Sequence, residues 1–492
     1  SLDLPPPPTS DRIRRRSELQ RSKPPIQLEA FELPTLSAVQ EVTDPGLTTP
    51  GSAWGLTTGD LELATALPSA TSSISRMPLV DGETNSTAPE LSPAEKALYR
   101  WKSRLHFAAL CWCFFLEGWN DGTTGPLLPR IQAYYGIGFA TVSLLFVLNC
   151  IGFISGAVIN VYLNERLGFG KVLVLGSLFQ LAAYAMLSPG GPFAIMCAAF
   201  GLAGFGISLQ NAQANGFVGA LKKNTSEKIG LLHASYGLGA FVAPLVATHF
   251  STTRHWSFHY LISAGIAVSN TALLSAVFRF RKQDEVLAEA GQAATESDAS
   301  QESKYRQILG IRTVHLLSVF ALIYVGVEVT LGGWIVTFIQ EKRGGGATTG
   351  YISSGFFGGL MIGRIALMWL NKKIGERRVM FLYALLAIQL EVTVWVVPSL
   401  VENAVAVAAI GLLLGPMYPI LMNYCTQILP KWLLTGSVGW IAGFGQAGSA
   451  VLPFATGLLA SKFGIGSLQP LIVSMMSTLI VIWAFVPRVR RV

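Results

Sequence analysis

Long apolar segments recur along this chain from Leu105 to its end, separated by short polar turns and by one longer polar stretch at 279–312. About 20 consecutive apolar residues are enough to cross the hydrocarbon core of a bilayer as a helix. The pattern therefore predicts an all-α membrane protein. We expect twelve transmembrane helices, over 105–128, 139–163, 171–189, 192–220, 229–251, 256–278, 313–340, 347–370, 378–398, 401–429, 433–461 and 466–486.

The twelve segments form two sets of six that repeat one another. Ile131 and Gln132 just after the first segment correspond to Ile339 and Gln340 at the end of the seventh, and the offset stays near 208 residues along the chain. Chance matches would not keep a constant offset. A parallel repeat of this kind predicts two pseudo-symmetric six-helix bundles, with a binding site between them near the middle of the membrane.

The same pattern divides the chain into five parts. Residues 1–98 are rich in Pro, Ser and Thr without a long apolar period, which is typical of a disordered tail. We therefore expect a disordered cytoplasmic N-terminal tail at 1–98, an N-terminal bundle at 99–278, a cytoplasmic central loop at 279–312, a C-terminal bundle at 313–487 and a cytoplasmic C-terminus at 488–492.

Charge gives the orientation. The formal net charge is +8, but the basic residues stand in short clusters between apolar segments, which is a topology signal and not a nucleic-acid surface. With the first segment running outward, most clusters fall on one side, among them Arg166, Lys171, Lys372 and Arg378. We therefore expect both termini in the cytoplasm, and a place in the plasma membrane or an endomembrane.

Two carboxylates inside the first segment are the strongest chemical signal. By the rise of a helix, Glu117 and Asp121 lie roughly 18 and 24 Å from its inner end, around and just past mid-membrane. An acid at that depth costs about 2.5–3.5 kcal/mol, so it is expected only where it faces a polar cavity. Residues four apart share a helix face. Each carboxylate disfavours charge on the other, so one of them is suited to carry a proton.

Amides form further polar stripes in the fourth and tenth segments. Asn211 and Asn215 are four residues apart, and Asn423 repeats Asn215 in the second half. Amides both donate and accept hydrogen bonds, which suits a neutral hydroxylated solute. The alternative is that they only join helices by hydrogen bonds, a common role of membrane Asn.

The second half adds an acid, a base and aromatic rings. Glu328 in the seventh segment is a second candidate for proton coupling. Arg364 in the eighth either reaches the inner membrane surface or pairs with a carboxylate in the cavity. Trp119 and Trp334 can serve as stacking platforms for a sugar, although aromatic residues in membrane helices more often only pack.

The arrangement of twelve helices as six plus six with a long middle loop resembles the major facilitator superfamily, and the turns at 164–171 and 371–378 resemble its signature turns. Within it, Gly118–Asp121, Gln210–Asn215 and His233–Ala240 resemble the fucose/proton symporter branch, especially its fungal relatives of the bypass-of-stop-codon type. The resemblance implies that Asp121 matches a helix 1 acid used in sugar binding and proton coupling, and that Arg364 matches an Arg of the family. Asn211 stands where the branch has a second acid, so this chain departs from the pattern there.

The function expected is a secondary transporter working by alternating access. Its likeness to the fucose/proton branch implies a small neutral solute such as a sugar, moved with or without a proton. Two alternatives stay open: an exporter of organic cations or xenobiotics, and a non-transporting membrane sensor. No nucleotide-binding loop, zinc motif or nucleophile elbow occurs in the sequence. We therefore expect no enzyme activity, cofactor, metal, nucleotide or nucleic-acid partner.

Overall fold

Helices account for nearly all of the chain that the computed structural model describes, which is residues 92–221, 224–291, 302–429 and 433–488. Of the tail expected at 1–98, residues 1–91 lie outside the described residues. From Pro93 onward the chain is helical, so the first helix begins before the tail boundary expected at 98. The elements described below all belong to one unit, Ser86–Val492.

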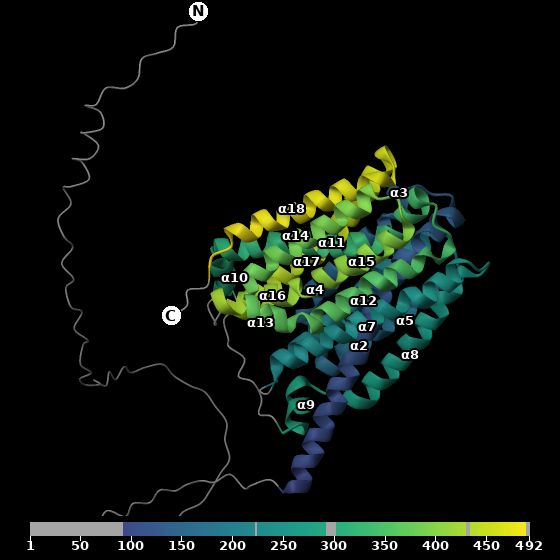
Figure 1. The fold of residues 1–492 in the computed structure, drawn as a ribbon. Helices are drawn as coiled ribbons and strands as arrows, with labels where there is room; N and C mark the ends of the chain where they lie inside the picture. Colours follow the sequence, from purple (N-terminus) through teal and green to yellow (C-terminus); the bar gives the residue numbers. More distant parts are fainter. Residues whose placement is uncertain (1–91, 222–223, 292–301, 430–432, 489–492) are drawn as a thin grey trace, which may run out of the picture. The chain divides into compact units, whose positions relative to one another are not determined.

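The first half contains six helical segments that coincide with the first six apolar segments. Two of them have a short element at their start: α3 precedes α4, and η1 precedes α8 (Figure 1). The elements are α2 (Pro93–Tyr135), α3 (Phe139–Val142), α4 (Leu144–Leu167), α5 (Phe169–Leu187), α6 (Phe193–Gly219), α7 (Thr225–Ser251), η1 (Trp256–Phe258) and α8 (His259–Phe278).

The second half repeats this order after the central loop. That loop is partly helical, since it contains α9 (Gln283–Glu289) and α10 (Glu302–Leu309). The remaining elements are α11 (Arg312–Arg343), η2 (Ala347–Gly350), α12 (Tyr351–Ala366), α13 (Met368–Ile374), α14 (Glu376–Val396), α15 (Leu400–Leu414), α16 (Met417–Ile428), α17 (Leu434–Phe463), η4 (Ile465–Ser467) and α18 (Leu468–Phe485).

Length and apolarity qualify nine helical segments as membrane spans within the described ranges. A tenth is added if α12 and α13, bent by 53° with respect to each other, count as one span. The remaining two of the twelve expected spans correspond to α2 and α17, which are rich in glycine and polar residues. The count of twelve spans thus depends on α2 and α17, which are not among the segments that qualify by length and apolarity.

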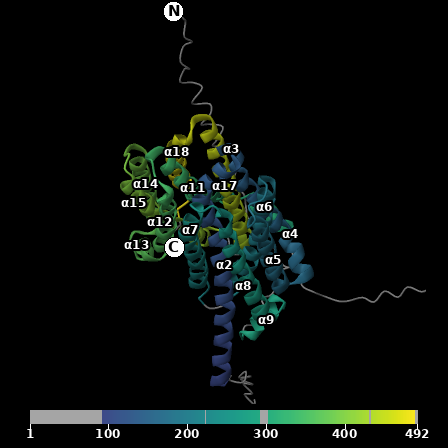
Figure 2. The ribbon, with the colours of Figure 1, turned by 90° about the vertical axis from the view of Figure 1, so that its right-hand side faces the viewer.

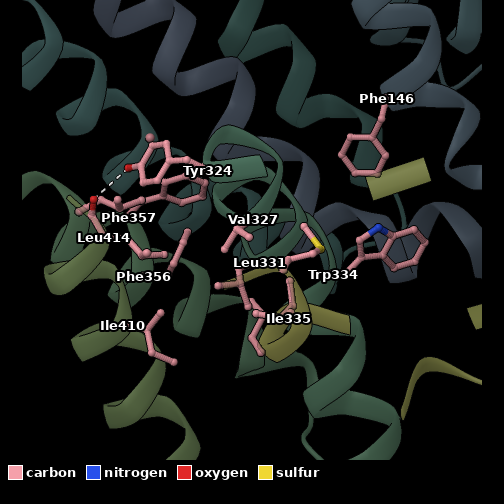
Figure 3. Packing of buried hydrophobic residues seen from close by; sticks show 14 of the residues in the cluster. Phe146, Tyr324, Val327, Leu331, Trp334, Ile335, Phe356, Phe357, Ile410 and Leu414 are labelled. Atoms are coloured by element: carbon pink, nitrogen blue, oxygen red, sulfur yellow. Dashed lines mark hydrogen bonds between the residues drawn. The ribbon is translucent and has the colours of Figure 1, made fainter. Parts of the chain in front are cut away.

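Large apolar side chains on the outside of the bundle match a lipid environment. Val158, Val401 and Phe485 are each more than 70% exposed. Inside, α11 is the centre of the second half. Its Leu331, Trp334 and Ile335 belong to one buried cluster with neighbouring helices, and the Tyr324 hydroxyl donates to the Leu414 carbonyl at 2.9 Å (Figure 3).

Small residues let the helices approach closely. A Cβ built on Gly118 of α2 would overlap the Tyr236 carbonyl of α7, so these two helices touch backbone to backbone. Such contacts are how membrane helices associate where no water is present to drive burial. The close α2–α7 contact brings the acids of α2 next to the polar face of α7.

The bundle has two ends. The basic end holds the start of α2, the α4–α5 turn and α9; for example, the Gly170 amide donates to the Arg281 carbonyl there at 2.9 Å. The far end holds the α2–α3, α5–α6 and α11–η2 turns. Figure 2 shows the start of α2 projecting past α9 at the basic end.

The two halves touch each other at the far end. A Cβ on Gly125 of α2 would overlap the Gly332 carbonyl of α11, and one on Gly350 would overlap the Thr248 hydroxyl. Towards the basic end, a Cβ on Gly439 or Gly443 of α17 would meet nothing within 4 Å. The halves therefore touch at the far end, whereas the face of α17 that carries Gly439 and Gly443 is open towards the basic end.

Candidate functional site

A cavity of about 160 Å³ lies between the two halves. Four helices of the first half (α2, α4, α6 and α7) and four of the second (α11, α12, α16 and α17) contribute lining residues. A buried water needs about 10–15 Å³ measured in this way, so the cavity has room for roughly ten water-sized groups. Its polar lining comes from both halves, which favours a polar solute over a lipid.

Glu117 lies on the α2 wall and is bound by amides. The Asn211 side chain of α6 donates from Nδ2 to Glu117 Oε1 at 2.8 Å. Asn215, one turn further along α6, donates in turn to Asn211 Oδ1 at 2.9 Å. The result is a hydrogen-bonded row that runs from the cavity towards the basic end, because α6 ends there.

Asp121 lies one turn further along α2 and has different partners. The Tyr236 hydroxyl of α7 donates to its Oδ2 at 2.8 Å, and Asn120 Nδ2 donates to its Oδ1 at 3.2 Å. The Tyr184 hydroxyl holds Asn120 by donating to its Oδ1 at 3.3 Å. Glu117 and Asp121 therefore share a helix face and a cavity, but each carboxylate is held by its own set of neutral donors.

The opposite wall carries a charged pair. Arg364 of α12 lies 3.4 Å from Glu328 of α11, and the two side chains are only 10% and 9% exposed. The same guanidinium donates to the His233 carbonyl of α7 at 3.1 Å and stands 5.7 Å from the Tyr236 ring centre. Arg364 thus neutralises Glu328 and also ties the second half to α7 of the first.

The structure brings most of the residues predicted from sequence into this cavity. Glu117, Asp121, Asn211, Glu328 and Arg364 all line it. Asn215 is placed behind Asn211 and does not line the cavity. Of the two roles considered for Arg364, the observed geometry is that of a counter-ion to a carboxylate.

Asn423 is the residue that the sequence misplaced. It is exposed near the end of α16 and, together with Gln427, donates to Glu376 at the start of α14. The tenth span is interrupted at Gly415 and Pro416, so α16 is a separate helix of 12 residues and Asn423 falls near its end. Asn423 corresponds to Asn215 in the internal repeat of the sequence. The two side chains nevertheless have different surroundings, since Asn215 donates to Asn211 and Asn423 donates to Glu376.

The two proposed stacking platforms are also absent from the cavity lining. The Trp119 indole is 3% exposed, donates to Ser263 at 2.8 Å and stacks on His259. The Trp334 indole is fully buried and donates to the Pro453 carbonyl at 3.0 Å. Both are packing residues, which was the alternative for membrane aromatics.

Several lining residues were missed by sequence reasoning. Tyr236 gave a weak signal, since it stands in the His233–Ala240 stretch used for the resemblance. Asn149, Gln446 and Ser449 gave none, because single polar residues in α4 and α17 resemble ordinary helix contacts. Gln446 Nε2 donates to Ser449 Oγ at 3.2 Å, so the α17 wall adds an amide and a hydroxyl to the cavity.

Hydrogen-bond donors and acceptors line the site from both halves. Among the described residues, no group of three or more His, Cys, Asp or Glu side chains is arranged to hold a metal ion. Carboxylates, amides, hydroxyls and phenols surround a space between two halves. This arrangement can bind a polar solute and exchange a proton with it or with water.

Sequence comparison places the chain among transport proteins. The profile described as Major Facilitator Superfamily matches residues 110–431. Bypass of stop codon protein 6 of Saccharomyces cerevisiae is 25% identical over 413 residues, covering 78% of this chain and 83% of the yeast protein. The glucose/mannose transporter GlcP of Bacillus subtilis is 22% identical over 354 residues, covering 70% of this chain and 85% of GlcP.

Solved structures share the fold. The Escherichia coli fucose:proton symporter FucP, in the outward conformation, aligns with a TM-score of 0.55 at 16% identity, over 78% of this chain and 98% of FucP. The nucleoside transporter NupG aligns with a TM-score of 0.64 at 9% identity, over 78% of this chain and 100% of NupG. The resemblance to the fucose/proton branch and its fungal relatives, expected from the sequence, is confirmed.

Proposed function

Because this chain belongs to the major facilitator superfamily, a family of membrane transporters, we propose that it carries a small hydroxylated solute, of the size of a monosaccharide, by alternating access. The observation that carries the proposal is the cavity itself, which is lined by both halves, and these touch at the far end. Rocking of the halves about such a site would open it to each side in turn.

The polar lining supports a neutral solute with several hydroxyl groups. The Asn211 and Gln446 amides can both donate and accept, and Ser449 adds a hydroxyl. A sugar hydroxyl likewise donates and accepts, so each wall can satisfy it. The names of the relatives agree, since GlcP is named a glucose/mannose transporter and FucP a fucose:proton symporter.

Proton coupling is the finer part of the proposal, and Glu117 and Asp121 are its proposed carriers. Neither carboxylate has a cationic partner among the described residues, whereas Glu328 has Arg364. A carboxylate held only by neutral donors can gain or lose a proton without breaking an ion pair. We assign the binding of the solute to both walls and the proton to the α2 wall.

The orientation belongs to the proposal as well. The excess of Lys and Arg at the basic end supports a cytoplasmic basic end and cytoplasmic termini. The contact between the halves at the far end then corresponds to an inward-facing conformation, in a plasma membrane or an endomembrane.

The experiment is uptake of radiolabelled glucose, mannose and fucose into proteoliposomes under an imposed pH gradient. We expect accumulation in the wild type that disappears in Asp121→Asn. The matched control is Asp284→Asn, the same change on the exposed face of α9, which should accumulate as the wild type does. Accumulation that survives in Asp121→Asn would refute the role of Asp121.

Glu117→Gln separates binding from coupling. Gln retains an oxygen that can accept from Asn211, so sugar exchange between the two sides should persist while gradient-driven accumulation is lost. Glu391→Gln is the control, because Glu391 is fully buried in α14 and outside the cavity. Unchanged accumulation in Glu117→Gln would remove Glu117 from the coupling mechanism.

An organic cation is a second candidate solute, favoured by the acidic α2 wall. Both of its carboxylates lack a cationic partner in the described part of the chain. Binding and efflux of a fluorescent cation, with no uptake of any sugar, would select this candidate. Sugar binding without flux would instead indicate a membrane sensor.

A further inference from the structure

The start of α2, at the basic end, is defined by a capping box. Ser92 caps the helix by accepting from the Glu95 amide at 3.2 Å, while its own amide donates to the Glu95 carboxylate at 2.8 Å. Hydrogen bonding from the Ser92 backbone amide first, and from the Ser92 hydroxyl second, holds the pKa of the Glu95 carboxyl below its usual value. The helix therefore begins at a defined residue, about 18 Å before the apolar segment starts at Leu105.

One face of this extension is docked against α9. The Glu289 carboxylate receives a hydrogen bond from Arg281 and lies 3.9 Å from Lys102 Nζ. One turn earlier on the same face, the Tyr99 ring lies so close to Gly291 that a Cβ there would be 3.1 Å away. These contacts fix the rotation of the extension about its own axis.

Another face of this extension is exposed among the described residues. Lys96, Arg100 and Arg104 follow at intervals of four, so they form one row along the helix. All three are exposed, and none forms an ion pair within the described residues. Trp101, three residues before Arg104 and therefore next to the end of this row, is 60% exposed.

We propose that this surface, formed by Lys96, Arg100, Trp101 and Arg104, binds the headgroups of anionic phospholipids in the leaflet at the basic end. Arg104 and Trp101 lie within about one turn of Leu105, which is the depth of the headgroup layer. Trp is enriched at that depth, with its ring among the headgroups and its N–H able to donate.

Charge and position favour a lipid as the occupant. Each basic residue near an anionic membrane surface contributes about 1 kcal/mol of attraction, which falls off within a Debye length. The row is continuous with a membrane helix: Arg104 and Arg100 lie about 1.5 and 7.5 Å before Leu105, at headgroup depth, and Lys96 lies about 13 Å before it, where its attraction to the surface is weaker. The docked face keeps the row turned away from α9 and towards those headgroups.

The test is a titration of the purified full-length chain with phosphatidylserine, and with phosphatidylcholine for comparison, followed by thermal unfolding and by mass spectrometry of co-purified lipid. The variant is Lys96→Gln/Arg100→Gln/Arg104→Gln. Two to three charges at this value each correspond to a fall of roughly 30- to 160-fold in the apparent affinity for phosphatidylserine, and we expect the affinity for phosphatidylcholine to be unchanged.

Two controls decide whether charge on this row is the cause. Lys96→Arg/Arg100→Lys/Arg104→Lys keeps the charge and should bind as the wild type does. Lys102→Gln removes one charge from the docked face of the same helix and should have little effect. The proposal is wrong if the triple Gln variant binds phosphatidylserine as tightly as the wild type, or if wild-type binding does not weaken with salt. Sugar flux is measured separately and does not bear on either result.

Discussion

Glu117 and Glu328 face the same cavity from opposite halves, yet their partners differ in charge. Glu117 accepts a hydrogen bond from the Asn211 amide, whereas Glu328 lies 3.4 Å from the Arg364 guanidinium. Hydrogen bonds from neutral donors leave the charge of a carboxylate uncompensated, while an ion pair cancels it. The difference teaches that similar acids in the two halves have different surroundings: the carboxylates of α2 accept hydrogen bonds from neutral donors, whereas Glu328 forms an ion pair with Arg364.

The largest effect is expected from breaking the pair on the second wall. Arg364→Gln leaves Glu328 buried without a counter-charge, which costs about 3–5 kcal/mol. We expect that loss in thermal or denaturant unfolding of the purified protein. The double variant Arg364→Gln/Glu328→Gln removes both charges and should recover most of the stability. Equal stability of the single variant and the wild type would mean that Arg364 does not stabilise the buried Glu328 carboxylate.

A smaller effect is expected from Tyr236→Phe on the first wall. The change removes the hydroxyl that donates to Asp121 and keeps the ring near Arg364. A hydrogen bond to a charged group contributes about 1.5–3 kcal/mol, so stability should fall by that amount while Asp121 is ionised. The control is Tyr418→Phe, which also lines the cavity. If both variants lose the same stability, the hydrogen bond from Tyr236 to Asp121 contributes no more to the free energy of unfolding than the hydroxyl of Tyr418 does.

The smallest effect is expected where sequence symmetry and structure disagree. Asn211→Ala removes the donor to Glu117 and should weaken solute binding about fivefold, which corresponds to about 1 kcal/mol for one hydrogen bond. Asn423→Ala removes a contact with Glu376 outside the cavity, so solute affinity should change by less than about twofold. Isothermal titration or substrate-protected thermal shifts measure both. Equal losses in the two variants would return Asn423 to the site.

Sequence was sufficient for the periodic features. Each of the twelve apolar segments coincides with a helix or a pair of helical elements, because apolarity over about 20 residues leaves a helix as the only way to satisfy the backbone in a membrane. Glu117 and Asp121 were also found from sequence, because a carboxylate at mid-membrane needs a polar cavity.

The contacts between side chains of different helices could not be predicted from the sequence. The pairing of Arg364 with Glu328 depends on how α12 rotates against α11, which spacing along the chain does not give. The interruption before α16 moved Asn423 out of the site, although its place in the repeat matches that of Asn215. Gln446 and Ser449 gave no signal because a polar residue in a helix faces a cavity or a neighbour according to rotation alone.

The sequence by itself determined the membrane class of this protein, its division into two repeated halves and the helix that carries its acids. These follow from local rules, since the cost of exposing polar groups to lipid applies residue by residue. Only the tertiary structure decided which carboxylate is paired, which amides reach the cavity and at which end the halves touch. Those features depend on contacts between helices far apart in the chain, where rotations and bends of a few residues change the partners of every side chain.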